Sequence, residues 1–147
     1  MDYNANFEAN YKREADIHAL YKEADTEEER AEVLARMDAF KSELKNKGLE
    51  YNKIYRHYVQ MKNRGNRYIN FDDVIQSPAE LIATLRKFGI DIFTFSSRWS
   101  GMIDNLADFI AAGCQFCGVT EIYSHYKVAF SDDYEKEKAI ILFIPEA

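Results

Sequence analysis

The sequence predicts an α/β fold, with an α+β arrangement as the alternative, in which three N-terminal helices precede a small sheet layer. Helical periodicity fills residues 1–66, whereas strand-like apolar runs alternate with amphipathic helices in residues 67–147. The second region therefore has the order β-α-β-α-β-β, and this alternation is typical of a mostly parallel sheet. We expect the helical region 1–66 and the sheet region 67–147 to form one compact unit.

The first two helices are predicted from residue spacing and from one capping signal. Thr26 followed by Glu29 is a capping box, which begins the second helix, and Gly48 is where that helix should end. Steps of three and four residues define the packing stripes of both helices. These stripes contain Phe7, Tyr11, Ile17, His18, Leu20, Tyr21 and Ala24, then Val33, Met37, Phe40 and Leu44.

The third predicted helix, residues 49–63, interleaves tyrosines with basic residues. Residues 53–67 hold five basic side chains and no acidic one: Lys53, Arg56, Lys62, Arg64 and Arg67. The pattern is typical of a solvated helix face with cations near its C-terminus. It is also compatible with a protein partner or with nucleic acid. The turn at residues 64–67 marks the expected boundary between the two regions.

The signals after this turn alternate between strand and helix. Strands are predicted at residues 68–71, 90–95, 114–123 and 139–144, with the last antiparallel to the third and a polar loop at 131–138. Ser77, Pro78 and Glu80 begin the helix that Gly89 ends. Ser96, Ser97 and Ser100 offer N-cap oxygens to the next helix. Its stripe begins at Trp99, which we expect to be buried, and Gly113 closes it.

Three runs of the sheet region resemble a known family. They are Tyr68-Ile-Asn-Phe-Asp-Asp-Val-Ile75, Gly89-Ile-Asp-Ile-Phe-Thr-Phe-Ser-Ser97 and Gly118-Val-Thr-Glu-Ile-Tyr-Ser124. These runs are similar to those of an uncharacterised family of small proteins from gut Firmicutes and their mobile genetic elements. The resemblance covers residues 67–145 and implies kinship, but the family has no activity to transfer.

Charge and composition indicate which partners suit the chain. Its net charge is −6, with 13 acids against 8 bases in residues 1–50, 4 against 8 in residues 51–100, and 8 against 3 in residues 101–147. Direct binding of nucleic acid is not expected of such a chain, whereas a protein with a basic surface suits it. No apolar run reaches the roughly 18 residues of a membrane span, and the N-terminus lacks a secretory signal. We therefore expect a cytoplasmic protein without a membrane partner.

Cys114 and Cys117 form a lone C-x-x-C motif. In redox proteins this motif opens a helix, but here it begins a strand, on which residues three apart point to opposite faces. A zinc site would need two more ligands, and His18, His57 and His125 have no ligand spacing. We therefore expect structural cysteines, no metal and no cofactor.

Polar residues follow the ends of the predicted strands, where α/β sheets bind ligands. If the sheet is parallel, these residues converge at one edge: Asp72, Asp73, Ser96, Ser97, Arg98, Trp99, Glu121, Ser124 and His125. Arg98 and a helix N-terminus could bind phosphate there. The chain lacks a dinucleotide fingerprint, a P-loop and a nucleophile elbow, so we assign no catalytic residue.

Two functions are therefore compatible with the sequence. The first is a non-enzymatic protein-binding protein that acts through acidic and aromatic surfaces, such as an anti-CRISPR-like inhibitor of a host defence complex. Its partner-binding residues would be Glu27, Glu28, Glu32, Asp132, Asp133 and Glu135. The alternative is an α/β module that binds a nucleotide or another phosphate-bearing ligand at the sheet edge, through Asp72, Asp73, Ser96, Ser97, Arg98 and Glu121.

Overall fold

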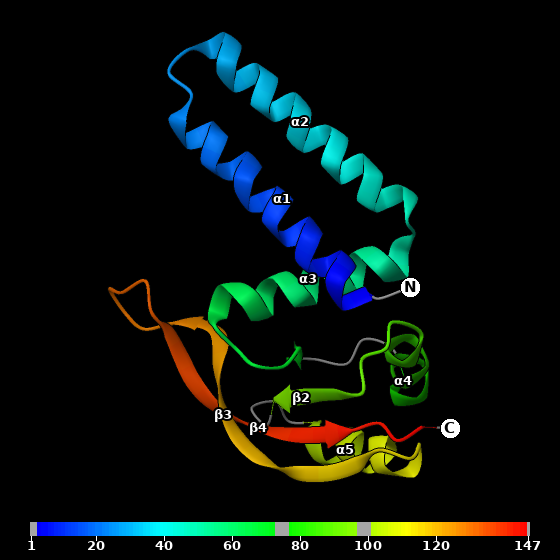
Figure 1. The fold of residues 1–147 in the computed structure, drawn as a ribbon. Coiled ribbons are helices and arrows are strands. Elements are labelled where there is room, and N and C mark those ends of the chain that lie inside the picture. The colour runs from blue at the N-terminus through cyan, green and yellow to red at the C-terminus, as the bar shows by residue number, and fades with distance from the viewer. Residues whose placement is uncertain (1–2, 73–76, 97–100, 147) are drawn as a thin grey trace. The chain divides into compact units, whose positions relative to one another are not determined.

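The structure is a computed structural model that describes residues 3–72, 77–96 and 101–146 (Figure 1). The chain divides into two compact units, Met1–Arg56 and His57–Ala147. The first unit contains α1 (Tyr3–Glu23), α2 (Glu27–Asn46) and the first half of α3 (Leu49–Arg64). The second contains the end of α3, β1 (Asn70–Phe71), α4 (Pro78–Lys87), β2 (Ile92–Ser96), α5 (Met102–Ala111), β3 (Gln115–Lys127) and β4 (Tyr134–Phe143).

Local signals place the starts of α2 and α4 where the sequence predicts them. The Thr26 hydroxyl accepts a hydrogen bond from the Glu29 backbone N–H at 3.1 Å, so the predicted N-cap of α2 is confirmed. Ser77 does the same for the Glu80 N–H at 3.3 Å, with Pro78 at the first helical position of α4.

The first unit is held by aromatic packing of α1 and α2 against the start of α3. The Phe7 ring lies 5.2 Å from that of Tyr51 and 5.8 Å from that of Tyr55, and Phe40 lies 6.4 Å from Tyr55. All four rings are buried, so they form the core of this unit.

One ion pair beside this core joins a buried carboxylate to a partly exposed guanidinium. The Glu14 carboxylate on α1, whose side chain is 11% exposed, lies 3.1 Å from the Arg56 guanidinium of α3. Charge pairing removes much of the cost of burying this carboxylate.

The second unit is built on a four-stranded mixed sheet of order β1-β2-β4-β3. The predicted fold class is confirmed in its α+β form: the described residues form five helices and this sheet. β1, β2 and β3 run in one direction, as a mostly parallel sheet requires. However, β4 lies between β2 and β3, so β1 and β2 form a parallel pair while β4 pairs antiparallel with both its neighbours.

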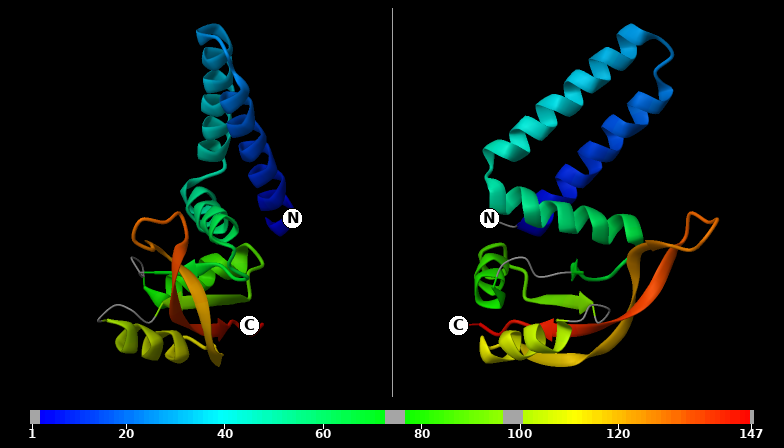
Figure 2. Two further views of the ribbon diagram at one scale, coloured as in Figure 1. Left: turned by 90° about the vertical axis from the view of Figure 1, so that its left-hand side faces the viewer. Right: turned by 180° about the vertical axis from the view of Figure 1, so that it is seen from behind.

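α5 covers one face of this sheet. It lies behind the strands in Figure 1 and in front of them in the rear view of Figure 2. The Phe109 ring of α5 lies 5.4 Å from both Phe93 and Phe95 of β2, and Phe71 of β1 lies 5.7 Å from Phe93. This chain of edge-to-face rings is the core of the second unit.

Two predicted details of this region are wrong. β3 and β4 are longer than expected, because their strand pairing continues through Glu121↔Lys138 and Tyr123↔Lys136 into the segment expected to be a polar loop. In addition, Gly101 is the N-cap of α5 and provides no side-chain cap, whereas Ser96 belongs to β2. Ser97, Trp99 and Ser100 lie outside the described residues.

Among the helices of residues 3–72, 77–96 and 101–146, none combines the length and the apolar character that a membrane span requires.

Candidate functional site

Six polar side chains of the second unit meet where β1 and β2 end, and we name them the Ser96 cluster. They come from α3, from β1 and the residue that follows it, from β2, β3 and β4. The members are Arg64, Asn70, Asp72, Ser96, His125 and Glu137. The parallel register Asn70↔Thr94 and the antiparallel register Ser96↔Ala139 put Asn70, Ser96 and Glu137 on the same face of the sheet. Arg64 and His125 join them through their contacts with Asp72.

Ser96 lies at the centre of this cluster and is only 2% exposed. Its hydroxyl donates to Glu137 Oε1 at 2.8 Å, lies 3.2 Å from Asp72 Oδ1, and accepts from Asn70 Nδ2 at 3.0 Å. Asn70 also donates to Asp72 Oδ1 at 2.9 Å, and its Oδ1 accepts from the buried Thr94 hydroxyl at 2.8 Å. Hydrogen bonding thus compensates the burial of these polar groups.

Asp72 connects the buried centre of the cluster to solvent. Its Oδ2 lies 3.4 Å from Arg64 Nη1 and 3.4 Å from His125 Nδ1. The Arg64 side chain is 9% exposed, whereas His125 is 45% exposed, so the solvent side of the cluster is formed by the imidazole and the carboxylate. The arginine neutralises one of the two carboxylates.

The geometry of the cluster argues against nucleophilic catalysis. In a serine relay, the imidazole must accept the hydroxyl proton, but the Ser96 hydroxyl is directed at Glu137 and His125 lies against Asp72. The buried hydroxyl is also closed to a substrate. Within the part of the chain that the structure describes, no three His, Cys, Asp or Glu side chains are placed to hold a metal ion.

The same geometry disfavours a phosphate ligand. Asp72 and Glu137 bring two carboxylates to the site, and the Arg64 guanidinium already lies against one of them. An incoming phosphate would meet like charges, which costs binding energy at short range. The sequence hypothesis of a phosphate site at this edge therefore depends on Arg98, which lies outside the described residues.

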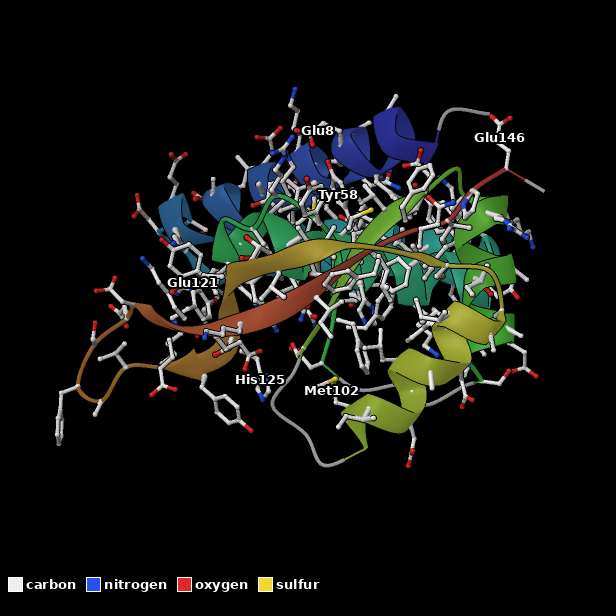
Figure 3. The ribbon with its side chains drawn as sticks, turned by 90° about the horizontal axis from the view of Figure 1, so that it is seen from below. Glu8, Tyr58, Met102, Glu121, His125 and Glu146 are labelled. Atoms are coloured by element: carbon white, nitrogen blue, oxygen red, sulfur yellow. The ribbon has the colours of Figure 1, made fainter. Side chains whose placement is uncertain are left out.

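The structure brings together some of the predicted ligand residues and separates others. Asp72 and Ser96 meet as predicted, and His125 joins them. Glu121 does not meet them. Its neighbour Ile122 is the register partner of the cluster member Glu137 and so lies on the face of the cluster. Because successive strand residues point to opposite faces, Glu121 lies on the other face. Figure 3 shows Glu121 and His125 at separate places along β3. Asp73, Ser97 and Arg98 lie outside the described residues.

Three cluster members are not predicted from the sequence. The sequence pattern assigns Arg64 to a solvated basic face, Asn70 to a strand without a role, and Glu137 to a polar loop. Strand alternation is the signal that could have found Glu137. Counting back in steps of two from the buried Ala139 puts Glu137 on the same face as Ala139.

The proposed acidic partner-binding residues fall on two separate surfaces. Glu27, Glu28 and Glu32 are exposed on α2, where Glu32 lies 3.3 Å from Arg36 one turn away. Asp132 and Asp133 are exposed in the β3–β4 loop, and Glu135 is half-buried at the start of β4.

A shallow groove of about 280 Å³ lies between the C-terminal end of α1 and the N-terminal half of α2. Its lining combines apolar side chains, of which Leu20 is 40% exposed, with three acidic ones and the basic Arg36. The lining residues are Leu20, Glu23, Ala24, Glu29, Glu32, Val33 and Arg36. A lining that is mainly apolar and acidic suits an apolar or long aliphatic side chain that ends in a positive charge.

The two cysteines lie in different environments. Cys114 is buried and Cys117 is exposed, and both are free thiols. Burial raises the pKa of the Cys114 thiol to about 11, although the nearby Arg86 lowers it in part. Cys114 is therefore almost wholly protonated near neutral pH, which makes it a weak nucleophile.

A second, larger cleft of about 520 Å³ lies at the opposite end of β2. Its walls come from the residues around Gly89 and from the segment after β4. The Arg86 guanidinium at its edge donates to the Pro145 carbonyl at 3.0 Å, so this charge is already used to hold the C-terminal segment.

Fold and cluster together define a mixed α+β domain with a buried, hydrogen-bonded polar network where β1 and β2 end. The sequence model of a protein family, a domain of unknown function (DUF7698), matches residues 53–144. Because this match covers more than half of the sequence, the chain belongs to the DUF7698 family, which is uncharacterised. Neither the curated proteins nor the solved structures contain a match to the chain.

Proposed function

We propose that the protein is a non-enzymatic binding protein whose partner is a protein with a basic surface. The observation that carries this proposal is the groove between α1 and α2, whose lining is mainly apolar and acidic. Leu20 and Leu34 are 40% and 51% exposed on these two helices, beside the exposed acids Glu27, Glu28 and Glu32. Apolar contact would supply affinity, and the acids would speed encounter with a cationic partner.

The Ser96 cluster supports a binding protein over an enzyme. Its hydroxyl is buried, its carboxylates are held by hydrogen bonds or by Arg64, and its imidazole lies away from the hydroxyl. These contacts join β1, β2, β3 and β4 and therefore have a structural use without any substrate. The alternative, a phosphate-binding module at this edge, would have to overcome the charges of Asp72 and Glu137.

A finer version of the proposal follows from the sequence resemblance to proteins of mobile genetic elements. Proteins of such elements gain from blocking host defence, and a defence nuclease exposes basic grooves that bind nucleic acid. An acidic protein can occupy such a groove. In this version the protein is an anti-CRISPR-like inhibitor that acts in the cytoplasm.

The experiment that tests the proposal begins with affinity capture of the full chain in native host lysate. The captured partner is purified, and its association rate is measured at low and high salt for wild type and two charge reversals. These are Glu27→Lys with Glu28→Lys and Glu32→Lys, and Asp132→Lys with Asp133→Lys and Glu135→Lys. Screening shortens electrostatic attraction to about 8 Å at physiological salt, so at least one triple variant should associate more slowly, with a weaker salt dependence.

A third variant is the matched control for net charge. Asp108, Glu121 and Glu146 are exposed acids outside both surfaces, and their reversal to Lys changes the net charge by the same amount. The control should bind at nearly the wild-type rate. If no stoichiometric partner is captured, or if all three variants associate equally fast, the proposal is wrong. A rise in melting temperature with inorganic phosphate or a nucleotide would favour the alternative instead.

A further inference from the structure

The hairpin of β3 and β4 continues past the end of β2 and forms an arm. Pairing of β2 with β4 ends at Ser96↔Ala139, whereas pairing of β3 with β4 continues to Lys127↔Tyr134. The arm extends away from the other strands of its unit (Figures 1 and 3). We name its loop, residues 128–133, the arm tip.

Hydrogen bonds give the arm tip a defined conformation. The Val128 N–H donates to the Asp133 carbonyl at 2.8 Å, and the Ser131 N–H donates to the Val128 carbonyl at 3.1 Å. The Ser131 hydroxyl accepts from the Asp133 N–H at 3.0 Å. Residues 128–131 are thus a closed β-turn with Phe130 at its third position.

Phe130 combines two unfavourable features at this position. Its φ is +61°, the left-handed region that glycine or asparagine occupies at lower cost, and Phe130 is the one described non-glycine residue with a positive φ. Its relative exposure is 110%, so the phenyl ring gains nothing from packing within the chain. A bulky residue in a strained turn that also leaves its ring in water indicates a function outside the fold.

The neighbours of Phe130 indicate the chemistry of what it meets. Tyr126 and Val128 are 47% and 44% exposed along the arm, so the apolar surface continues from the tip. Asp132 and Asp133 are exposed beside the ring. These two carboxylates oppose contact with an anionic bilayer or with nucleic acid, and they favour a pocket bordered by Lys or Arg.

We infer that the arm tip is a docking element, in which Phe130 enters an apolar pocket of a partner protein and Asp132 and Asp133 meet basic residues at the pocket rim. This inference rests on the proposed function and adds the arm tip as a further contact surface for the same partner. A buried aromatic anchor inside a polar rim is a common arrangement at protein interfaces. A turn fixed by hydrogen bonds presents that anchor with little loss of conformational entropy.

Photo-crosslinking tests the inference on the full chain in native host lysate. Benzoylphenylalanine is placed at position 130 and, as matched controls, at Val119 on β3 and at Ile103 on α5, which are 59% and 74% exposed. Position 130 should crosslink one protein, and the crosslinked peptide of that protein should line an apolar pocket bordered by Lys or Arg. Crosslinks to a second copy of this chain, to lipid or to nucleic acid would overturn the inference.

Affinity measurements with the purified partner then distinguish the contribution of the Phe130 ring from that of the turn conformation. Phe130→Ala should weaken binding at least about tenfold, as truncation of a hot-spot aromatic does, whereas Phe130→Trp should retain it. Phe130→Gly removes the ring and suits the positive φ, so it should weaken binding while raising the melting temperature. If a captured partner binds the Phe130→Ala variant as tightly as wild type, the inference fails and the proposed function stands. If position 130 crosslinks nothing and no partner is captured, both fail.

Discussion

Ser96 is the residue on which the polar network of the sheet depends. Its buried hydroxyl donates to Glu137 at 2.8 Å and accepts from Asn70 at 3.0 Å, and so connects β1, β2 and β4. Removing a buried hydroxyl of this kind lowers the free energy of unfolding by more than the net contribution of its hydrogen bonds. The partner groups are desolvated already and cannot recover water.

Ser96→Ala should therefore lower the free energy of unfolding by about 1–3 kcal/mol. Ser131→Ala is the control, because Ser131 is half-buried in the hairpin loop and its hydroxyl accepts a single bond from the Asp133 N–H. That change should cost less than about 1 kcal/mol. Urea unfolding of the two variants measures the difference. Equal and small losses would show that the network contributes little to stability.

Cys114 gives a residue-scale prediction about pH. Burial raises the pKa of its thiol to about 11, compared with about 8.5 for a free cysteine in an unfolded chain. The folded state therefore holds this proton more tightly, and its contribution to stability is complete below about pH 8.5 and lost as the pH rises towards 11. Cys114→Ala should remove this part of the alkaline decline in melting temperature, and Cys117→Ala should leave it unchanged.

Thiol labelling at pH 8 provides an independent measurement of the same difference. With a pKa of about 11, the thiolate form of Cys114 is about a thousandth of the total at that pH. A disulfide reagent should modify the exposed Cys117 quickly and Cys114 only after denaturant is added. Rapid modification of both thiols in the folded protein would contradict the buried position of Cys114.

At the scale of elements, two of the three tyrosines of α3, Tyr51 and Tyr55, look equivalent in sequence and differ in structure. The Tyr51 hydroxyl bonds to the side chains of Asn6 and of Asn10, the latter at 2.6 Å. The Tyr55 hydroxyl is buried and has no hydrogen-bond partner among the described residues. Burial and the charge of Glu14 raise the pKa of this second phenol.

The two tyrosines form a matched pair for mutation to phenylalanine. Tyr55→Phe removes an unsatisfied buried hydroxyl, so it should leave the free energy of unfolding unchanged or raise it. Tyr51→Phe removes hydrogen bonds and should lower it by about 1 kcal/mol. Urea unfolding of both variants gives the comparison. A loss at position 55 as large as that at position 51 would mean that the Tyr55 hydroxyl has a partner in solution.

The elements that the sequence predicted best are those with local signals. Thr26 and Ser77 begin α2 and α4 because each cap needs only neighbouring backbone N–H groups. Strand order is not local: residues 139–144 have the same apolar pattern whether β4 lies at the edge or between β2 and β3. The position of β4 depends on packing and pairing across the whole sheet, which periodicity does not contain.

The candidate site could be predicted in part for the same reason. Parallel pairing of β1 with β2 brings Asp72 and Ser96 together, and the sequence indicates that pairing through its β-α-β order. The contribution of Glu137 requires the pairing of β4 beside β2, which the sequence pattern does not indicate. The assignment of Ser96 as an N-cap is wrong because a serine after a strand suits both a cap and a strand end.

At the scale of the whole molecule, the family match and the two compact units divide the chain in nearly the same place. The DUF7698 family matches residues 53–144, and the second unit is His57–Ala147. The helical hairpin of α1 and α2, with the groove between these helices, therefore lies outside the part that defines the family. We expect the sheet unit to be the common scaffold and the helical hairpin to be specific to fewer relatives.

This division predicts that a fragment starting at Leu49 folds without α1 and α2. The fragment keeps all of α3, although the boundary between the two units falls inside this helix, between Arg56 and His57. It also keeps the aromatic core of Phe71, Phe93, Phe95 and Phe109. Removal of Phe7 and Phe40 exposes Tyr51 and Tyr55, so both are changed to Ser to limit aggregation. The fragment should unfold cooperatively in urea with a smaller m-value than the full chain, because less surface is buried. A non-cooperative transition, with strand signals lost from circular dichroism, would show that the sheet unit needs the helical hairpin to fold.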